Sequence, residues 1–166
     1  IFPTASGIWF TASTGTTTGL FWMQPDGSAV TRVTPDEGVY GNIHFSEDLS
    51  RFVYTRESPT EPAELYTARL VTRNLPPRPS DVSALTRHNQ EMARFAVGRT
   101  EVITWNSVDG RTIDGVLVYP ANYTEGTRVP LVVKFHGGPA GAYHQNFQAN
   151  GYAWNQGYAW NQGYAW

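Results

Sequence analysis

The sequence predicts a mixed fold, in which antiparallel β-structure comes first and the beginning of an α/β sheet follows. Aromatic residues make up 14% of the chain, and together with Thr and Val they fit the pleated, half-buried surface of a sheet. In residues 7–69, short alternating runs are divided by turn residues at the spacing typical of antiparallel all-β domains. Residues 129–135 then form a nearly continuous apolar run, which is typical of a strand buried on both faces of a helix-covered sheet.

The composition narrows the possible functions. The formal net charge is -2 and the basic residues are scattered, so we expect no nucleic acid partner. No uncharged apolar run approaches the ~20 residues that span a bilayer, so we expect a soluble protein without a membrane partner. The absence of Cys excludes disulfides and thiol catalysis. No signal peptide is visible, and cytoplasmic, periplasmic and secreted locations stay open, as does the oligomeric state.

Alternating segments in the first half predict six short strands, at residues 8–12, 20–24, 29–33, 43–45, 51–55 and 64–70. The turn Pro25-Asp26-Gly27 joins the second and third strands into a hairpin, because Pro presets φ and Gly tolerates a positive φ. After these strands the proline-rich residues 75–81 are expected to form a surface loop, since each Pro removes a backbone donor.

A domain boundary is expected near residues 97–100. Before this boundary we expect a short strand at residues 83–86, then helical turns or an irregular linker at residues 88–96. After it, residues 101–105 and 112–119 alternate in polarity around an Asp-Gly turn. Because Asp-Gly suits turns that need positive φ, the pattern predicts a second hairpin.

The segment His136-Gly137-Gly138-Pro139 carries the candidate functional residues. An α/β-hydrolase needs a backbone N–H after its third strand, aimed at the oxygen that becomes negative in the tetrahedral intermediate. Without Cβ atoms, Gly137 and Gly138 let the backbone turn sharply and approach a ligand closely. One such donor is worth about 3 to 4 kcal/mol in the barrier. We expect Pro139 to stiffen the loop, and His136 to order it through a hydrogen bond from its ring to the backbone.

Two parts of the chain resemble the prolyl oligopeptidase family of serine peptidases. The segment His44-Phe45-Ser46-Glu47-Asp48, followed by Arg51-Phe52-Val53-Tyr54, is similar to a recurring signature of that family's β-propeller blades, over one blade-length unit. The start of the family's catalytic domain is matched, in order, by Trp105-x-Ser107-x-Asp109-Gly110, Gly115-x-Leu117, Tyr119-Pro120, Pro130-Leu131-Val132 and His136-Gly137-Gly138-Pro139. The last motif is more similar to the acylaminoacyl-peptidase branch than to the dipeptidyl-peptidase IV branch.

This resemblance implies one or more C-terminal propeller blades at residues 1–97 and the N-terminal part of an α/β-hydrolase domain at residues 98–154. It implies a short peptide as the substrate of the complete enzyme, and no cofactor. A Ser nucleophile on a Gly-x-Ser-x-Gly elbow, followed by Asp and His, is also implied. No such elbow occurs here, and all four His precede its place. We therefore expect a fragment that lacks the catalytic triad and is inactive alone.

Other interpretations stay open. Residues 155–166 repeat the unit Gly-Tyr-Ala-Trp, which we interpret as an artificial or misassembled terminus, although a genuine aromatic segment would expose an apolar patch. A non-catalytic β-rich binding module is one alternative function. An esterase or lipase is another, because it shares the oxyanion loop but normally lacks an upstream blade. His136 and His144 have no further ligand at metal spacing, so no metal site is expected.

Overall fold

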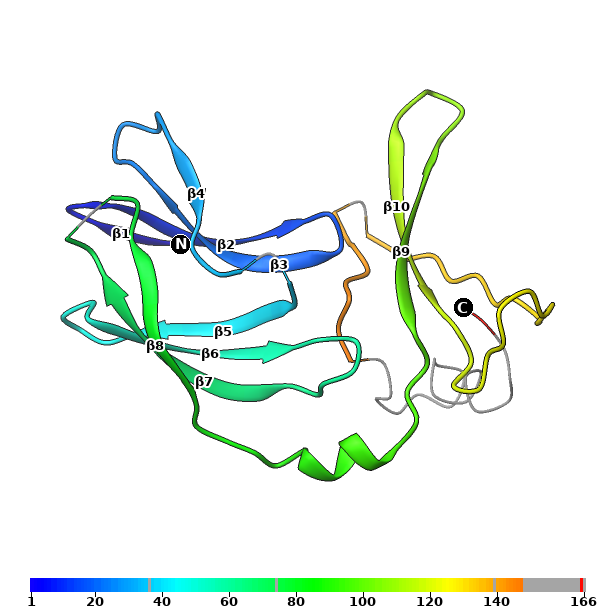
Figure 1. Cartoon of the computed structure of the whole chain (residues 1–166). Helices are drawn as coiled ribbons and strands as arrows, with labels where there is room; N and C mark the ends of the chain where they lie inside the picture. The colour runs from blue at the N-terminus through cyan, green and yellow to red at the C-terminus, as the bar shows by residue number, and fades with distance from the viewer. Residues whose placement is uncertain (36, 74, 139, 148–164, 166) are drawn as a thin grey trace.

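The computed structural model of the chain describes residues 1–35, 37–73, 75–138, 140–147 and 165. These residues form two four-stranded antiparallel sheets and one separate two-stranded hairpin. Figure 1 shows the two sheets together on one side of the molecule and the hairpin on the other. No α-helix occurs among the described residues, which contain one short 3-10 helix at Gln90–Arg94.

The first sheet has the strand order β1-β2-β3-β4, with each strand antiparallel to its neighbour. Its strands are β1 Phe2–Thr4, β2 Gly7–Thr14, β3 Thr17–Met23 and β4 Val30–Arg32. The hairpin predicted around Pro25-Asp26-Gly27 is confirmed, since β3 pairs with β4. The N–H of Gly27 donates to the carbonyl oxygen of Gln24 at 2.9 Å, and the φ of Gly27 is 76°.

The second sheet repeats this arrangement in the order β5-β6-β7-β8. Its strands are β5 Val39–Phe45, β6 Arg51–Glu57, β7 Glu64–Val71 and β8 Arg78–Ala84. Four-stranded antiparallel sheets of this kind are the blades of β-propellers. The sequence resemblance covers one blade-length unit, whereas the structure contains two blade-like sheets in succession.

Strand β8 corrects one expectation. Residues 75–81 were expected to form a loop, but the strand begins at Arg78 and includes Pro79, which pairs with Leu70. Pro is compatible with a strand at the edge of a sheet, where its missing N–H can face away from the neighbouring strand. Among the described strands, only β7 neighbours β8. The strand also ends at Ala84, two residues before the end expected from the sequence.

One hydrophobic core joins the two sheets. The rings of Trp9, from β2, and Phe45, from β5, lie 5.3 Å apart and link the sheets directly. Phe52 stacks on Tyr54 at 5.3 Å and is only 1% exposed. The buried members of the core are Trp9, Leu20, Trp22, Val33, Tyr40, Ile43, Phe52, Tyr54, Ala68 and Leu70.

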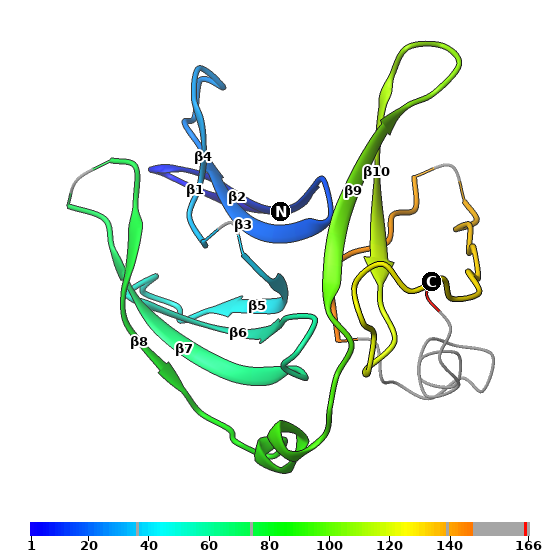
Figure 2. The ribbon, with the colours of Figure 1, turned by 45° about the vertical axis from the view of Figure 1, so that its right-hand side comes forward.

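The hairpin after the 3-10 helix is as predicted. Strand β9 (Thr100–Asn106) pairs with β10 (Thr112–Val118) in an antiparallel register. In the turn between them, the N–H of Gly110 donates to the carbonyl oxygen of Ser107 at 2.9 Å, and the φ of Gly110 is 81°. Figure 2 shows the hairpin beside the sheets, with its turn pointing away from the rest of the chain.

The apolar run at residues 129–135 does not form the expected buried strand. Leu131, Val133 and Phe135 are 60%, 62% and 86% exposed, and the run makes one isolated parallel bridge, from Leu131 to Ala165. A β-branched run becomes a buried strand only where neighbouring strands satisfy its backbone groups, and no described strand pairs along this one. The expected α/β-hydrolase sheet is therefore not seen in the part of the chain that the structure describes.

Two further expectations are not tested by the structure. Of the repeat at residues 155–166, only Ala165 is described. The domain boundary near residues 97–100 stays a prediction. Among the residues that the structure describes, no helix has the length and apolar character needed to cross a membrane.

Candidate active-site loop

The candidate residues lie in a loop at residues 134–143, which we call the Gly-Gly loop. Gly138 has a φ of 72°, a left-handed conformation that glycine adopts without the penalty of a Cβ atom. Among the described residues, a Cβ built on Gly137 or Gly138 would meet no atom within 4 Å beyond its chain neighbours, so the space beside their backbone is open there. The N–H of Gly141 donates to the carbonyl oxygen of Gly138 at 3.0 Å and turns the chain back. Pro139 lies outside the described residues.

Tyr143 closes this loop onto its own beginning. Its hydroxyl donates to the carbonyl oxygen of Phe135 at 3.4 Å, and its ring meets the His136 ring edge to face at 5.8 Å. The ammonium of Lys134 lies 5.1 Å from the centre of the same ring, within the range of a cation–π contact. His136 is thus held by ring packing, and its expected hydrogen bond to the backbone stays a prediction.

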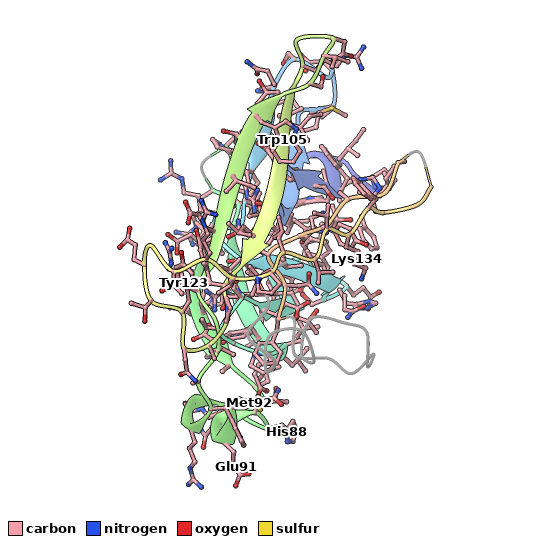
Figure 3. The ribbon with its side chains drawn as sticks, turned by 90° about the vertical axis from the view of Figure 1, so that its right-hand side faces the viewer. His88, Glu91, Met92, Trp105, Tyr123 and Lys134 are labelled. Carbon is pink, nitrogen blue, oxygen red and sulfur yellow. The ribbon has the colours of Figure 1, made fainter. Side chains whose placement is uncertain are left out.

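A cavity of about 550 Å³ lies beside the Gly-Gly loop. Apolar side chains of the β9–β10 hairpin and of residues 131–135 form most of its wall, and the turn between β2 and β3 closes one side. Figure 3 faces this side of the molecule, with Trp105 on the hairpin and Lys134 at the start of the loop. Its lining includes Gly15, Thr16, Ile103, Trp105, Ile113, Asp114, Val116, Leu131, Val133, Lys134, His136 and Tyr143.

Residues 144–147, which we call the anchor segment, fasten the end of the loop to the sheets. The N–H and the side-chain amide of Gln145 donate to the carbonyl oxygen and the hydroxyl of Thr16, both at 2.8 Å. Phe147 is buried, and its N–H donates to a carboxylate oxygen of Glu57 at 3.1 Å. In Figure 1 this segment, drawn in orange, runs between the ends of the sheets and the hairpin.

A third contact in the anchor segment joins the imidazole Nε2 of His144 to the hydroxyl of Ser13 at 2.9 Å. Burial lowers the pKa of His144, so the neutral ring is favoured at pH 7. Burial also raises the pKa of Glu57, and the hydrogen bond from the N–H of Phe147 offsets part of that rise. Ionised Glu57 therefore occupies a partly desolvated position whose charge is stabilised by a backbone donor.

Sequence reasoning missed this anchoring. The contact between Thr16 and Gln145 spans 129 residues, and that between Glu57 and Phe147 spans 90. Serine, threonine and glutamate occur throughout the chain, so no local pattern marks Ser13, Thr16 or Glu57 as partners of a distant loop. The described residues contain no group of three or more His, Cys, Asp or Glu side chains that could hold a metal ion.

No family model matches the chain. Over 144 residues it is 27% identical to the uncharacterized peptidase YuxL of Bacillus subtilis, a match that covers 82% of this chain and 20% of that protein. The chain is similar to a peptidase.

Solved structures give a likeness in fold. The acylaminoacyl peptidase of Pyrococcus horikoshii matches 97% of this chain and 23% of its own, with a TM-score of 0.68 and 22% identity. The dipeptidyl peptidase 4 of Porphyromonas gingivalis matches 97% of this chain and 22% of its own, with a TM-score of 0.68 and 14% identity. The chain therefore spans about a fifth of the length of the proteins that it matches.

Proposed function

We propose that the chain is part of a serine-type peptidase of the prolyl oligopeptidase family that acts on short peptides. The observation that carries the proposal is the order of the structural elements along the chain. Two blade-like sheets come first, and a β-hairpin and a glycine loop with an open backbone follow. The likeness to two peptidase structures extends over 97% of the chain, not over the sheets alone. An esterase or lipase is less well supported, because it would not need the preceding sheets.

In the complete enzyme, a Ser hydroxyl attacks the peptide carbonyl, a His takes the proton, and an Asp orients the His. The negative oxygen of the tetrahedral intermediate then needs preorganised donors. We assign the backbone N–H groups of Gly137 and Gly138 to this role, since both positions are free of side-chain obstruction. The triad itself would lie in sequence other than residues 1–166, and this chain alone would be inactive.

The resemblance of His136-Gly137-Gly138 and the following Pro to the acylaminoacyl-peptidase branch favours release of a single N-terminal residue over release of a dipeptide. Within this proposal the two sheets limit access of large substrates to the site. The apolar cavity beside the Gly-Gly loop is the feature that favours the alternative of a binding module without catalysis.

Labelling with a fluorophosphonate tests the proposal. The complete coding frame and the 166-residue chain are expressed separately and treated with the probe, and the labelled peptide is identified by mass spectrometry. We expect the complete protein to label on one Ser outside residues 1–166 and to cleave short acylated peptides, and the 166-residue chain to stay unlabelled. A complete protein that does not label, or a labelled Ser within residues 1–166, would overturn the proposal.

A further inference from the structure

The Gly-Gly loop is held from the side of the sheets by a contact distant in sequence. Thr16 lies in the turn between β2 and β3 and is 8% exposed. It receives two hydrogen bonds from one residue, Gln145, through its carbonyl oxygen and its hydroxyl. Two bonds to backbone and side chain together fix both the position and the orientation of Gln145, which a single bond would not do.

Gln145, which is bonded to Thr16, lies close to Gly137 and Gly138 in the sequence. Tyr143, two residues before Gln145, contacts Phe135 and His136 at the beginning of the loop. Five residues of extended chain can reach about 17 Å, so the segment from Gly138 to Tyr143 could place the glycines in many positions if its end were free. With Gln145 held on Thr16 and Tyr143 held on Phe135, the loop is closed at both ends.

We propose that Thr16 is a positioning residue for the Gly-Gly loop, acting through Gln145. The proposal rests on the proposed function, because it matters for catalysis only if this loop binds the oxyanion. It also gives the first sheet a role beyond limiting access, since a strand turn of that sheet helps to set where the donors of the loop point. Glu57, which accepts the N–H of Phe147, supports the same segment from the second sheet.

Position matters strongly for an oxyanion donor. A donor binds the oxygen in the transition state more strongly than the carbonyl of the bound substrate, so its displacement lowers kcat and leaves KM nearly unchanged. Displacements below 1 Å suffice, because catalytic groups need to be held within about 0.5 Å of their productive geometry. Loss of a contact that merely stabilised the fold would lower the unfolding midpoint without this selective effect on kcat.

The test is Thr16→Val in the complete enzyme. Val keeps the shape and the backbone carbonyl of Thr16 but removes the hydroxyl that accepts the Gln145 amide. Thr16→Ser keeps the hydroxyl and serves as the rescue variant, and Thr11→Val, at an exposed position of β2, is the matched control. We measure kcat and KM separately on a short peptide, and hydrogen exchange of residues 134–143 by mass spectrometry.

We expect Thr16→Val to lower kcat about 10-fold with KM within about twofold, and to speed hydrogen exchange in the Gly-Gly loop. Thr16→Ser and Thr11→Val should stay close to wild type in both readouts. If Thr16→Val leaves loop exchange and kcat unchanged, or lowers kcat without faster loop exchange, the proposal is wrong. If Thr16→Val fails to fold, Gln145→Ala removes the same hydrogen bond from the side of the half-buried partner, with the same expected results.

The two proposals can fail separately. If wild-type complete protein has no peptidase activity and does not label with fluorophosphonate, the proposed function fails, and Thr16 positions no oxyanion donor. Faster hydrogen exchange of the Gly-Gly loop in Thr16→Val would then show that Thr16 anchors the loop, without any role in catalysis. If wild type is active and Thr16→Val is equal to it in kcat and exchange, the proposed function stands and the positioning role is overturned.

Discussion

Replacing Gly141 by Ala should disturb the candidate oxyanion residues without unfolding the protein. A Cβ at Gly141 would lie 2.7 Å from the carbonyl oxygen of Gly137 and 3.0 Å from Nδ1 of His136. Ordinary contacts begin near 3.4 Å, so the Gly137 oxygen must move by about 0.7 Å if Gly141 keeps its place. The nearest atom belongs to the backbone, so no side-chain rotation can relieve the contact.

The expected effect follows from that displacement. A misplacement of about 1 Å at a catalytic centre can cost on the order of 10²-fold in rate, and loss of one oxyanion donor costs about 10² to 10³ in kcat. We therefore expect Gly141→Ala to lower kcat of the complete enzyme by roughly 10²-fold, with KM little changed. The free energy of unfolding should change by about 1 kcal/mol or less, because Ala restricts the unfolded chain and offsets part of the strain.

Peptide hydrolysis kinetics and urea unfolding of the same preparations provide the assay, with Gly126→Ala as the matched control. Gly126 has a φ of 82° and open space around it, so Ala there costs about 1 to 2 kcal/mol of stability and spares activity. Gly141→Ala is thus expected to lower activity with little change in stability, whereas Gly126→Ala is expected to lower stability with little change in activity. The reasoning is refuted if Gly141→Ala retains wild-type kcat, or if Gly126→Ala loses as much activity as Gly141→Ala.

Three other predictions concern the sheets. Phe52→Ala should lower the free energy of unfolding by about 3 to 5 kcal/mol, because Phe52 is 1% exposed and stacked on Tyr54; a loss below about 1 kcal/mol in urea unfolding contradicts this. Gly7→Ala should lower the free energy of unfolding by about 1 to 3 kcal/mol more than Gly27→Ala does, since both glycines have positive φ but only a Cβ at Gly7 would clash with Nε1 of Trp22. Equal unfolding midpoints of the two variants would argue against this. Burial raises the pKa of Glu57 above its ordinary value of 4.5, so the folded state binds a proton more tightly than the unfolded state. Stability should therefore fall as pH rises from 4.5 through the raised pKa, and Glu57→Gln should flatten that slope; parallel profiles of the two proteins exclude this cause.

Hairpins were the most predictable part of the fold because their signals are local. Pro25-Asp26-Gly27 and Asp109-Gly110 each supply a residue that accepts positive φ, and the structure has a turn at both places. The first part of strand β8 was not foreseen, because Pro79 weakens a strand in general and only the position at a sheet edge makes it acceptable. Whether a strand lies at an edge is decided by its neighbours, which the local sequence does not contain.

The apolar run at residues 129–135 was predicted as a strand but does not form one, again because its neighbours decide the outcome. Its β-branched residues have strong strand propensity, yet Val133 is 62% exposed. Propensity describes how a side chain fits a sheet that already exists, and here no described strand lies along both sides of the run. The pattern was therefore informative about the kind of strand that the run can form and not about whether its partners are in place.

The candidate site divides in the same way. Gly137 and Gly138 could be singled out from the sequence, because their lack of a Cβ is a local property. Their use as oxyanion donors stays a prediction. The contacts of Thr16 with Gln145 and of Glu57 with Phe147 could not be predicted from the local sequence. Each depends on sheets that bring together residues at least 90 positions apart.

These distant contacts argue against treating the sheets and the Gly-Gly loop as independent units. The start of the loop lines the cavity together with the hairpin. The anchor segment at its end is bonded to Thr16 of the first sheet and to Glu57 of the second. A movement of the sheets relative to the hairpin would therefore act on the chain between Tyr143, which contacts the start of the loop, and Gln145, which is bonded to Thr16. Because an oxyanion donor tolerates only a fraction of an ångström, docking of the sheets would be part of the catalytic geometry of the proposed enzyme, even though none of the acting groups lies in them.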